Sequence, residues 1–493
     1  MSLRFRKAVS LAEERILENP RRHGGQPHLL LAVAPVLLAG CAVGPNYKRP
    51  ATDVPANFRA PAPLPPAQAA SLADLKWFEV FKDDKLQELI RQSLVANYDL
   101  RDAVTRVEAA SANLGIIRSN QYPNFGASGN VAINRLSRNG ETPIPVELLS
   151  NQNRNFGTAT LDLLSFEVDI WGHLRRATEA ARANLLSAEE TRKAVITTLV
   201  SDVATAYFTL RELDYTLEIS QRTLQTRQES LVLTKQRQVG GVATRLDLRQ
   251  AEQRVYTAEE TIPAIQRQIE QTENQITLLL GQNPGGVVRG HSLTEQSLPP
   301  EVPAGLPSTL LERRPDIRAA EQDLIAANAN IGVAKAAYFP TLSLSGFLGG
   351  QSTQLSSLFS GPSSAWSLVP QLTQPIFTAG KLKSGVRLAQ AQREHALVQY
   401  QKTIQTAFTE VSDALIAHQR VRESREKQEA LVSALQDRLV LAYARYRGGV
   451  DTQLNALDAD RDLFQAELDL AGIRLQELLT VVQLYKALGG GWQ

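Results

Sequence analysis

Apolar residues recur every three or four positions over two long stretches of the chain, and this spacing predicts long helices. Residues 173–239 and 386–447 contain neither Gly nor Pro. Uninterrupted helices of that length would extend roughly 90 to 100 Å at about 1.5 Å per residue. Ordinary globular domains do not use such helices, so the pattern predicts an elongated, mainly helical molecule.

Each long stretch is followed by a glycine pair and then by a segment with a regular apolar stripe. Gly240-Gly241 and Gly448-Gly449 are expected to reverse the chain, because glycine tolerates the positive φ of tight turns. The spacing predicts that each segment folds back on its long partner as a coiled coil. The first stripe has one polar member, Thr272, among Leu248, Ala251, Val255, Ala258, Ile262, Ile265, Ile269, Thr272, Ile276 and Leu279. The second has one, Arg461, among Leu454, Leu457, Arg461, Phe464, Leu468, Ala471, Leu475, Leu478, Val482 and Tyr485.

Two shorter zones show the alternation of small or polar residues with apolar ones that is typical of strands. The zones are 158–163 and 341–345. A period of two is expected in a barrel that has one face toward lipid. Four strands cannot close around a water channel, whereas three chains with four strands each would form a twelve-stranded barrel. A plain coiled-coil rod would explain the helices equally well, but it would not explain these strands.

An internal repeat covers most of the chain. Eight residues recur 217 positions later: Asp99, Arg101, Ala103, Ala110, Ala112, Asn113, Gly115 and Pro123 return as Asp316, Arg318, Ala320, Ala327, Ala329, Asn330, Gly332 and Pro340. Beyond Gly172 the offset is 208, as in Gly172 and Gly380 or Gly240 and Gly448. The first copy therefore has nine more residues between Pro123 and Gly172, which we place in a loop. Each copy is expected to contain a helix, two strands and a long helical hairpin.

These patterns divide the 493 residues into six predicted segments. They are a signal peptide (1–40), an extended N-terminal arm (41–82), the first repeat (83–281), a linker (282–307), the second repeat (308–489) and a short tail (490–493). The arm contains a Pro/Ala-rich stretch, residues 50–70, which cannot be helical throughout because proline removes backbone donors.

Charge and composition argue against an enzyme and against a nucleic-acid partner. The formal charge is only +2, and the six histidines are scattered without an HExxH motif or a Cys/His cluster. No Gly-rich phosphate-binding loop followed by Lys is present. We therefore expect no catalytic residue, no metal and no cofactor.

Cys41 is the single cysteine, and its position predicts a lipid anchor. It follows a basic stretch, an apolar run from Leu29 to Leu38 and the small residues Ala39 and Gly40, the layout of a lipoprotein signal peptide. The apolar run is too short to span a bilayer. Cleavage before Cys41 would leave its thiol at the new N-terminus for acylation. The alternative is a buried structural cysteine after an ordinary signal peptide.

Five motifs, in this order, resemble the outer membrane factor family of TolC-like efflux channels, and most closely its lipoprotein branch. They are Cys41-Ala-Val-Gly-Pro-Asn-Tyr-Lys-Arg-Pro50, Phe166-Glu-Val-Asp-Ile-Trp-Gly172, Arg313-Arg-Pro-Asp316, Ala337-Tyr-Phe-Pro340 and Gly448-Gly-Val-Asp-Thr452. The resemblance implies a homotrimeric tube: a twelve-stranded outer-membrane barrel, a periplasmic barrel of coiled helices and an equatorial region formed by residues 50–90, 282–312 and the C-terminus. Ala42 after Cys41 favours outer-membrane sorting, by resemblance to enteric lipoproteins.

The same resemblance implies a function and partners. The chain would be the passive exit duct of a tripartite pump for drugs or other toxic small molecules. Its partners would be a periplasmic adaptor (membrane fusion) protein, an inner-membrane transporter of the resistance-nodulation-division type and outer-membrane lipid. Two alternatives stay open from the sequence: a trimeric duct for polypeptide secretion, and a coiled-coil envelope scaffold without a pore.

Residue roles at the hairpin tips also come from the resemblance. The family's periplasmic gate falls on Leu454, Asp458 and Arg461, with Asp247 in the first hairpin. Asn455 stands where some members have a second aspartate, which weakens the case for a doubled acidic ring. Adaptor contacts are expected at Val239, Gly240, Gly241, Val242, Gly448, Gly449 and Val450.

Because Arg461 occupies a stripe position, its guanidinium needs an acceptor. Asp458, three residues earlier, and Asp247 are the candidates. A purely stabilising pair, or an arginine whose stem covers the stripe while its charge reaches water, is the alternative to a gate.

Overall fold

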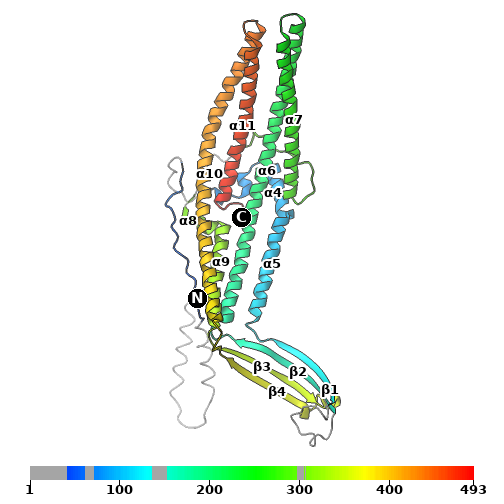
Figure 1. Ribbon diagram of the computed structural model, residues 1–493, viewed down its shortest axis with the longest axis vertical. Helices are drawn as coiled ribbons and strands as arrows, with labels where there is room; N and C mark the ends of the chain where they lie inside the picture. The colour runs from blue at the N-terminus through cyan, green and yellow to red at the C-terminus, as the bar shows by residue number, and fades with distance from the viewer. Residues whose placement is uncertain (1–41, 61–70, 136–152, 297–304, 306, 493) are drawn as a thin grey trace, which may run out of the picture.

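A computed structural model describes residues 42–60, 71–135, 153–296, 305 and 307–492 of the chain. The predicted signal peptide and Cys41 lie outside the described residues. Figure 1 shows an elongated molecule with two helical hairpins at one end and a curved sheet at the other. The predicted fold class, mainly helical with four strands per chain, is confirmed.

Helices form most of the chain. The first half contains η1 (Leu72–Asp74), α3 (Trp77–Val80), α4 (Asp84–Ala96), α5 (Tyr98–Ser119), α6 (His173–Val239) and α7 (Arg245–Leu279). The second half contains α8 (Pro307–Arg313), α9 (Pro315–Ala336), the short turns η3 (Leu355–Ser357) and η4 (Gly361–Ser363), α10 (Lys381–Arg447) and α11 (Gln453–Ala487). Helices α6 and α10 each have 67 residues, about 100 Å at 1.5 Å per residue.

Two helix limits differ from those expected. The single helix expected at the start of the first repeat is two helices, α4 and α5. Asn97 separates them with non-helical backbone and caps α5 by accepting a hydrogen bond from the Leu100 amide. Helix α10 begins five residues before the Gly-free stretch and includes Gly385.

The four strands are β1 (Phe125–Arg135), β2 (Asn153–Val168), β3 (Thr341–Ser352) and β4 (Ser364–Thr373). They form one antiparallel sheet in the order β1-β2-β3-β4, so each repeat contributes two neighbouring strands. The β2–β3 pair, which joins the repeats, changes register between Leu163 and Phe166. No helix among the described residues has both the length and the apolarity required to cross a membrane.

Between the sheet and mid-length, the helices lie in a layer in which α5 packs on α6, α6 on α9 and α9 on α10. Beyond mid-length, α7 returns along α6, α11 returns along α10, and α11 also packs on α6. The main hydrophobic core lies at mid-length, where α4 and the C-terminal end of α11 pack around α6. Its fully buried side chains include Leu86, Ile90, Tyr207, Leu210 and Tyr485.

Residues 43–47 of the arm contact α6, α9 and the end of β2's connection to α6. The Val43 amide donates to the Trp171 carbonyl at 2.9 Å, and Arg176 reaches the side-chain oxygen of Asn46 at 2.6 Å. Farther along, the Tyr47 hydroxyl donates to Glu321 at 3.0 Å. These contacts tie the first residues of the arm to both repeats.

Candidate functional site

Both hairpins end in tips with the same backbone geometry. Gly241 and Gly449 have φ values of 74° and 71°, which side-chain-bearing residues rarely adopt. The Val242 amide donates to the Arg237 carbonyl at 2.8 Å, and the Val450 amide makes the equivalent bond to Arg445 at 3.1 Å. Val239, Val242 and Val450 are exposed at the tips, as a docking surface requires.

The residues predicted to form a gate lie just inside the second tip. Leu454 is 53% exposed. Asp458 forms an ion pair with Arg461 at 3.4 Å, as expected, and also lies 3.8 Å from Arg254 of the first hairpin. The Arg461 side chain is 61% exposed and binds Asp462 more closely, at 2.9 Å. The expectation that Arg461 sits in the seam of its hairpin is therefore wrong for the single chain.

Asp247 lies at the first tip, where it caps a helix. Its carboxylate accepts from the Thr244 amide at 2.7 Å, while the Asp247 amide donates to the Thr244 hydroxyl at 3.2 Å. This reciprocal arrangement is a capping box at the start of α7. Within the chain, Asp247 is a helix cap and does not pair with Arg461.

A charged side chain is buried near the second tip, that of Asp460, one residue before Arg461. Its carboxylate accepts from the Arg227 guanidinium at 2.9 Å, and both side chains are only 6% exposed. Consecutive helical residues are rotated by about 100°, so a shift of one position moves the buried face from Arg461 to Asp460. Arg227 belongs to α6, so the pair joins the two hairpins. Sequence reasoning missed it, since 233 positions separate the partners.

Further contacts between the hairpins surround this pair. The side-chain amide of Gln453 donates to the buried Thr234 hydroxyl at 2.9 Å. Arg222 pairs with Glu467 at 2.7 Å nearer the middle of the molecule. At the tip itself, the Arg237 guanidinium lies 4.5 Å from the centre of the Tyr446 ring. The second hairpin is thus anchored on the first by α6 side chains along much of its length.

The exposed ion pairs near the second tip keep their carboxylates charged. Hydrogen bonds from Arg461 and then Arg438 lower the pKa of Asp462 below its ordinary value. A hydrogen bond from Arg445 lowers the pKa of Asp451 in the same way. A lowered carboxylate pKa means that these pairs stabilise the tip at neutral pH and are lost only as the pH falls through the folded-state pKa, below about 4.

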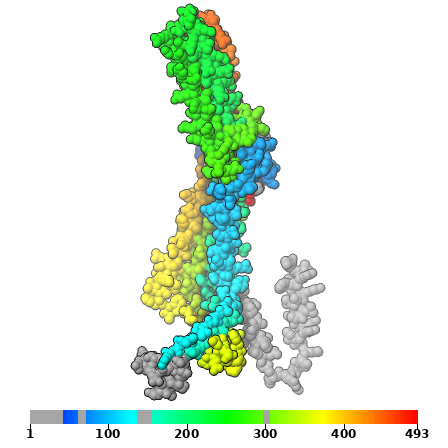
Figure 2. All heavy atoms as spheres, turned by 90° about the vertical axis from the view of Figure 1, so that its right-hand side faces the viewer, coloured from blue at the N-terminus to red at the C-terminus, as the bar shows by residue number. Residues whose placement is uncertain are grey.

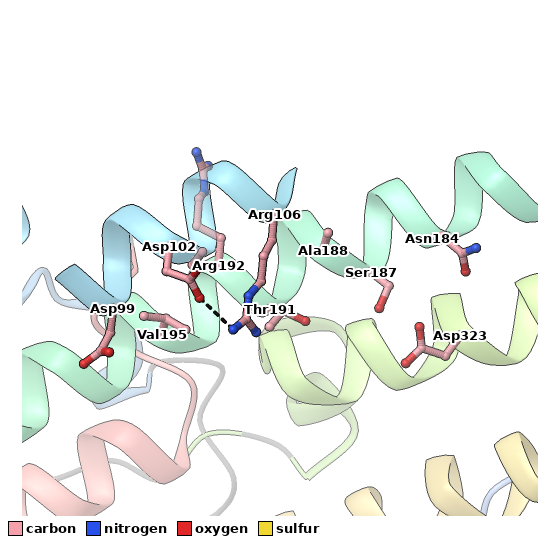
Figure 3. A pocket seen from close by; sticks show the side chains of 11 residues that line it. Asp99, Asp102, Arg106, Asn184, Ser187, Ala188, Thr191, Arg192, Val195 and Asp323 are labelled. Atoms are coloured by element: carbon pink, nitrogen blue, oxygen red, sulfur yellow. Dashed lines mark ion pairs between the residues drawn. The ribbon is translucent and has the colours of Figure 1, made fainter. Parts of the chain in front are cut away.

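A polar groove of about 440 Å³ lies among α5, α6 and α9 (Figure 3). Asp99, Asp102, Asp323 and Arg192 line it together with Arg106, which pairs with Asp102 at 2.6 Å. Among the residues that the structure describes, no group of three or more His, Cys, Asp or Glu side chains is placed to hold a metal ion.

The two repeats correspond to a known family model. The model, described as "Outer membrane efflux protein", matches residues 89–282 and 306–490. The chain is 40% identical over 471 residues to the probable efflux pump outer membrane protein TtgC of Pseudomonas putida, covering 94% of this chain and 95% of that protein. It is 36% identical over 474 residues to the outer membrane protein OprJ of Pseudomonas aeruginosa, with 95% and 96% covered.

Solved structures share the whole architecture. The open state of the MtrE outer membrane channel of Neisseria gonorrhoeae has a TM-score of 0.83 and 32% identity, and the alignment covers 92% of this chain and 99% of that one. The outer-membrane channel OprN has a TM-score of 0.83 and 31% identity, with 92% and 100% covered. Because each alignment covers 92% of this chain, the likeness includes both the paired hairpins and the sheet.

Proposed function

The chain belongs to the outer membrane efflux protein family and is the outer-membrane channel component of an efflux pump, and from that premise we propose how its parts work. Three copies form a passive, non-enzymatic duct for toxic small molecules. The four strands of each copy contribute to a twelve-stranded barrel in the outer membrane, and the helices continue the tube through the periplasm.

The proposal rests on two different structures at opposite ends of the molecule, a sheet at one end and a pair of helical hairpins at the other (Figure 1). Among the described residues, the edge strands β1 and β4 have no partner on their outer sides, and such edges are normally paired or protected. On the other side, two helices of 67 residues make a rod of about 100 Å. A sheet that closes only with other copies and a long helical rod together suit a tube that crosses both the membrane and the periplasm.

The test of this function is conductance. Purified protein in planar bilayers should produce channels, and a deletion strain should regain export of toxic compounds when the gene is returned together with its pump partners. Absence of any channel from protein that forms trimers would instead favour an envelope scaffold. Export of a polypeptide without any effect on small molecules would favour a secretion duct.

We place the closed gate at the second tip, on Leu454, Asp458 and Arg461. The Arg461 guanidinium is held by two carboxylates, Asp458 and Asp462, and Asp458 also faces Arg254 of the first hairpin. Three such clusters around the tube would narrow its end. A partner can open the duct if it binds more tightly to the arrangement in which the hairpin tips of the three copies lie apart. Asp247 supports the gate only by capping the first tip.

The partners are a periplasmic adaptor and an inner-membrane transporter of the resistance-nodulation-division type. The exposed valines of the tips, Val239, Val242 and Val450, suit adaptor docking because they leave apolar surface at the far end of the rod. Replacing Val242 or Val450 by Asp should weaken adaptor cross-linking without lowering trimer yield, since the turn glycines are unchanged. Undiminished cross-linking would place the adaptor elsewhere.

A lipid anchor at Cys41 completes the proposal. Residues 43–46 are fastened beside the junction between the helices and the sheet, which would place an acyl chain near the membrane surface. Replacing Cys41 by Ser should abolish incorporation of a tagged palmitate, because acylation requires the thiol. Label retained by the Ser variant would rule out this anchor.

A further inference from the structure

A pocket of about 310 Å³ lies where the sheet meets the helices. The end of β2 and the turn into α6 line one side of it, and the end of α9 and the start of β3 line the other. Figure 1 shows the strands leaving the helices at an angle at this end of the molecule, and Figure 2 shows the same end turned by 90°. The pocket is formed by both repeats of one chain, and its volume is within the usual range for small-molecule sites.

One face of the sheet is apolar. Leu348 is paired with Leu161 on one side and with Trp366 on the other. Residues directly opposite each other in neighbouring strands share a face, and all three of these side chains are exposed, Trp366 by 74%. Exposed leucine and tryptophan side chains in a row are expected on the lipid side of a barrel.

The pocket opens on the other, polar face of the sheet. Thr341 is seven residues before Leu348 in the same strand, so the two side chains point to opposite faces. Thr341 is paired with Thr373, and Glu167 is paired with Ser343, two residues after Thr341. Thr341, Thr373 and Glu167 all line the pocket. In the proposed barrel this face is the inner one, which lines the path of exported molecules.

Aromatic and apolar side chains form much of the pocket wall. Trp171 and Phe339 both line the pocket, and their rings are stacked with centroids 4.7 Å apart. The Trp171 indole donates to the Pro340 carbonyl at 2.8 Å, which fixes the orientation of the ring. Ile170 lines the pocket beside them. Such a wall suits an apolar group, and tryptophan is the side chain that attracts cations most strongly through its ring.

The charge that remains uncompensated in the pocket is negative. The Glu167 side chain is 32% exposed and lies 3.2 Å from Nδ1 of His173, and no Lys or Arg among the described residues forms an ion pair with it. Helix α9 ends at the pocket with Ala336, and the C-terminal end of a helix carries a partial negative charge. Asp169 also lines the pocket, but it is paired with Arg175 at 3.2 Å.

We infer that this pocket binds a small organic cation, a quaternary or protonated amine that carries one aromatic or branched apolar group. The charge lies toward Glu167, and the apolar group lies against Trp171 and Phe339. The inference rests on the proposed duct, because the pocket is then on the path of export. It adds that the duct retains organic cations where the helical tube meets the barrel.

Two fluorinated probes of similar size test the pocket. 4-Fluorobenzyltrimethylammonium carries a positive charge, and 4-fluorobenzyl alcohol does not. In fluorine NMR titrations with the full chain in a non-ionic detergent, the cation should bind saturably and at least about fivefold more tightly than the alcohol. Glu167→Gln replaces the carboxylate by a neutral group of the same shape, so it should lower the affinity for the cation about fivefold and leave that for the alcohol unchanged.

Asp162→Asn is the matched control. Asp162 is paired with Phe347, four residues after Ser343, so it lies on the same polar face but does not line the pocket. This variant loses the same charge as Glu167→Gln, yet it should bind the cation like the parent. Equal losses in the two variants would show a general attraction of cations to the inner face and would overturn the pocket.

A third variant blocks the pocket without changing its charge. Ala337 lines it at the end of α9, and Ala337→Phe should abolish saturable binding of both probes while trimer yield and helix content stay as in the parent. Saturable binding retained by this variant would place the site elsewhere and overturn the inference.

Channel formation separates failure of the pocket from failure of the duct. A parent protein that conducts in planar bilayers but binds the cation no better than the alcohol would overturn the pocket and leave the duct standing. Selective, Glu167-dependent binding by protein that forms no channel would support the pocket and overturn the duct.

Discussion

The two hairpin tips have the same backbone turn but are held by different side chains. In the first, Thr244 and Asp247 form a capping box that belongs to one helix alone. In the second, Thr452 makes no capping bond through its side chain, and Asn455, the counterpart of Asp247, donates to Asp451 at 2.7 Å. Asp451 in turn accepts from Arg445 at 3.0 Å. The first tip is therefore stabilised by hydrogen bonds within the first turn of α7, whereas the second is stabilised by the side chains of Arg445, Asp451 and Asn455.

The difference continues along the hairpins. The second hairpin leans on α6 through the buried Arg227–Asp460 pair and the Gln453–Thr234 bond. A hairpin that is held by hydrogen bonds and ion pairs can move if a partner protein offers it equivalent hydrogen bonds and ion pairs. We therefore expect the second hairpin to be the one that moves when the duct opens, with the first as its support.

The largest effect should come from breaking the buried pair. Arg227→Ala leaves the Asp460 carboxylate buried without a partner, which costs about 3–5 kcal/mol. Hydrogen exchange of the amides of residues 453–460 should become much faster. That of α7 should change little outside the turn that follows Arg254, whose carbonyl accepts from Arg227 at 3.4 Å. The control Arg227→Met/Asp460→Leu removes both charges and should recover most of the protection. Equal losses in the two variants would mean that packing, and not charge, anchors the second hairpin.

A smaller effect is expected from the capping residues. Thr244→Ala should destabilise the start of α7 by about 1 kcal/mol, because the Asp247 amide loses its acceptor. Thr452→Ala should cost clearly less, since the Thr452 side chain makes no such bond. Exchange of the amides of residues 245–248 and 453–456 measures both. Equal costs at the two tips would remove the contrast between them.

The smallest effect is expected from a variant that tests whether the residues of the turn alone cause the difference between the two tips. Asp451→Ala/Asn455→Asp gives the second tip the residues of the first, where Ala243 and Asp247 stand. The new carboxylate can accept from the Thr452 amide, and the Thr452 hydroxyl can then accept from the amide of residue 455. Exchange at that amide should slow by about fivefold, equivalent to about 1 kcal/mol. Unchanged exchange would show that Thr452 is held in a rotamer that cannot cap.

The fold could be predicted where strong local signals mark the ends of elements. Helix α6 ends where expected, because Gly172 and the Gly240-Gly241 turn bound a stretch free of Gly and Pro. The first apolar stripe is also buried as expected from Ala251 through Ile276, except that Ile262 is half-buried. The break at Asn97 was missed, since it depends on one capping side chain within a continuous helical pattern.

The site could be predicted only in part. In the second stripe, the residues toward the middle of the molecule are buried as expected, among them Ala471, Leu478 and Val482. Near the tip, Arg461 is exposed, and Asp460 beside it is buried against Arg227. No local signal in the sequence links these two residues, which come from different repeats. Likewise, the sequence showed Asp462 beside Arg461 but not that their side chains meet at 2.9 Å.

The most direct test of the gated duct is the single-channel conductance of the Asp458→Ala/Arg461→Ala variant in planar bilayers. Both side chains are partly or largely exposed, so trimer stability should change little. If the ion pairs at the second tip hold the duct closed, the variant should conduct several-fold more than the parent, on the order of a shift of 1 kcal/mol in the opening equilibrium. Large antibiotics should then leak inward in cells that carry it. A variant that conducts like the parent and admits no antibiotic would contradict the account.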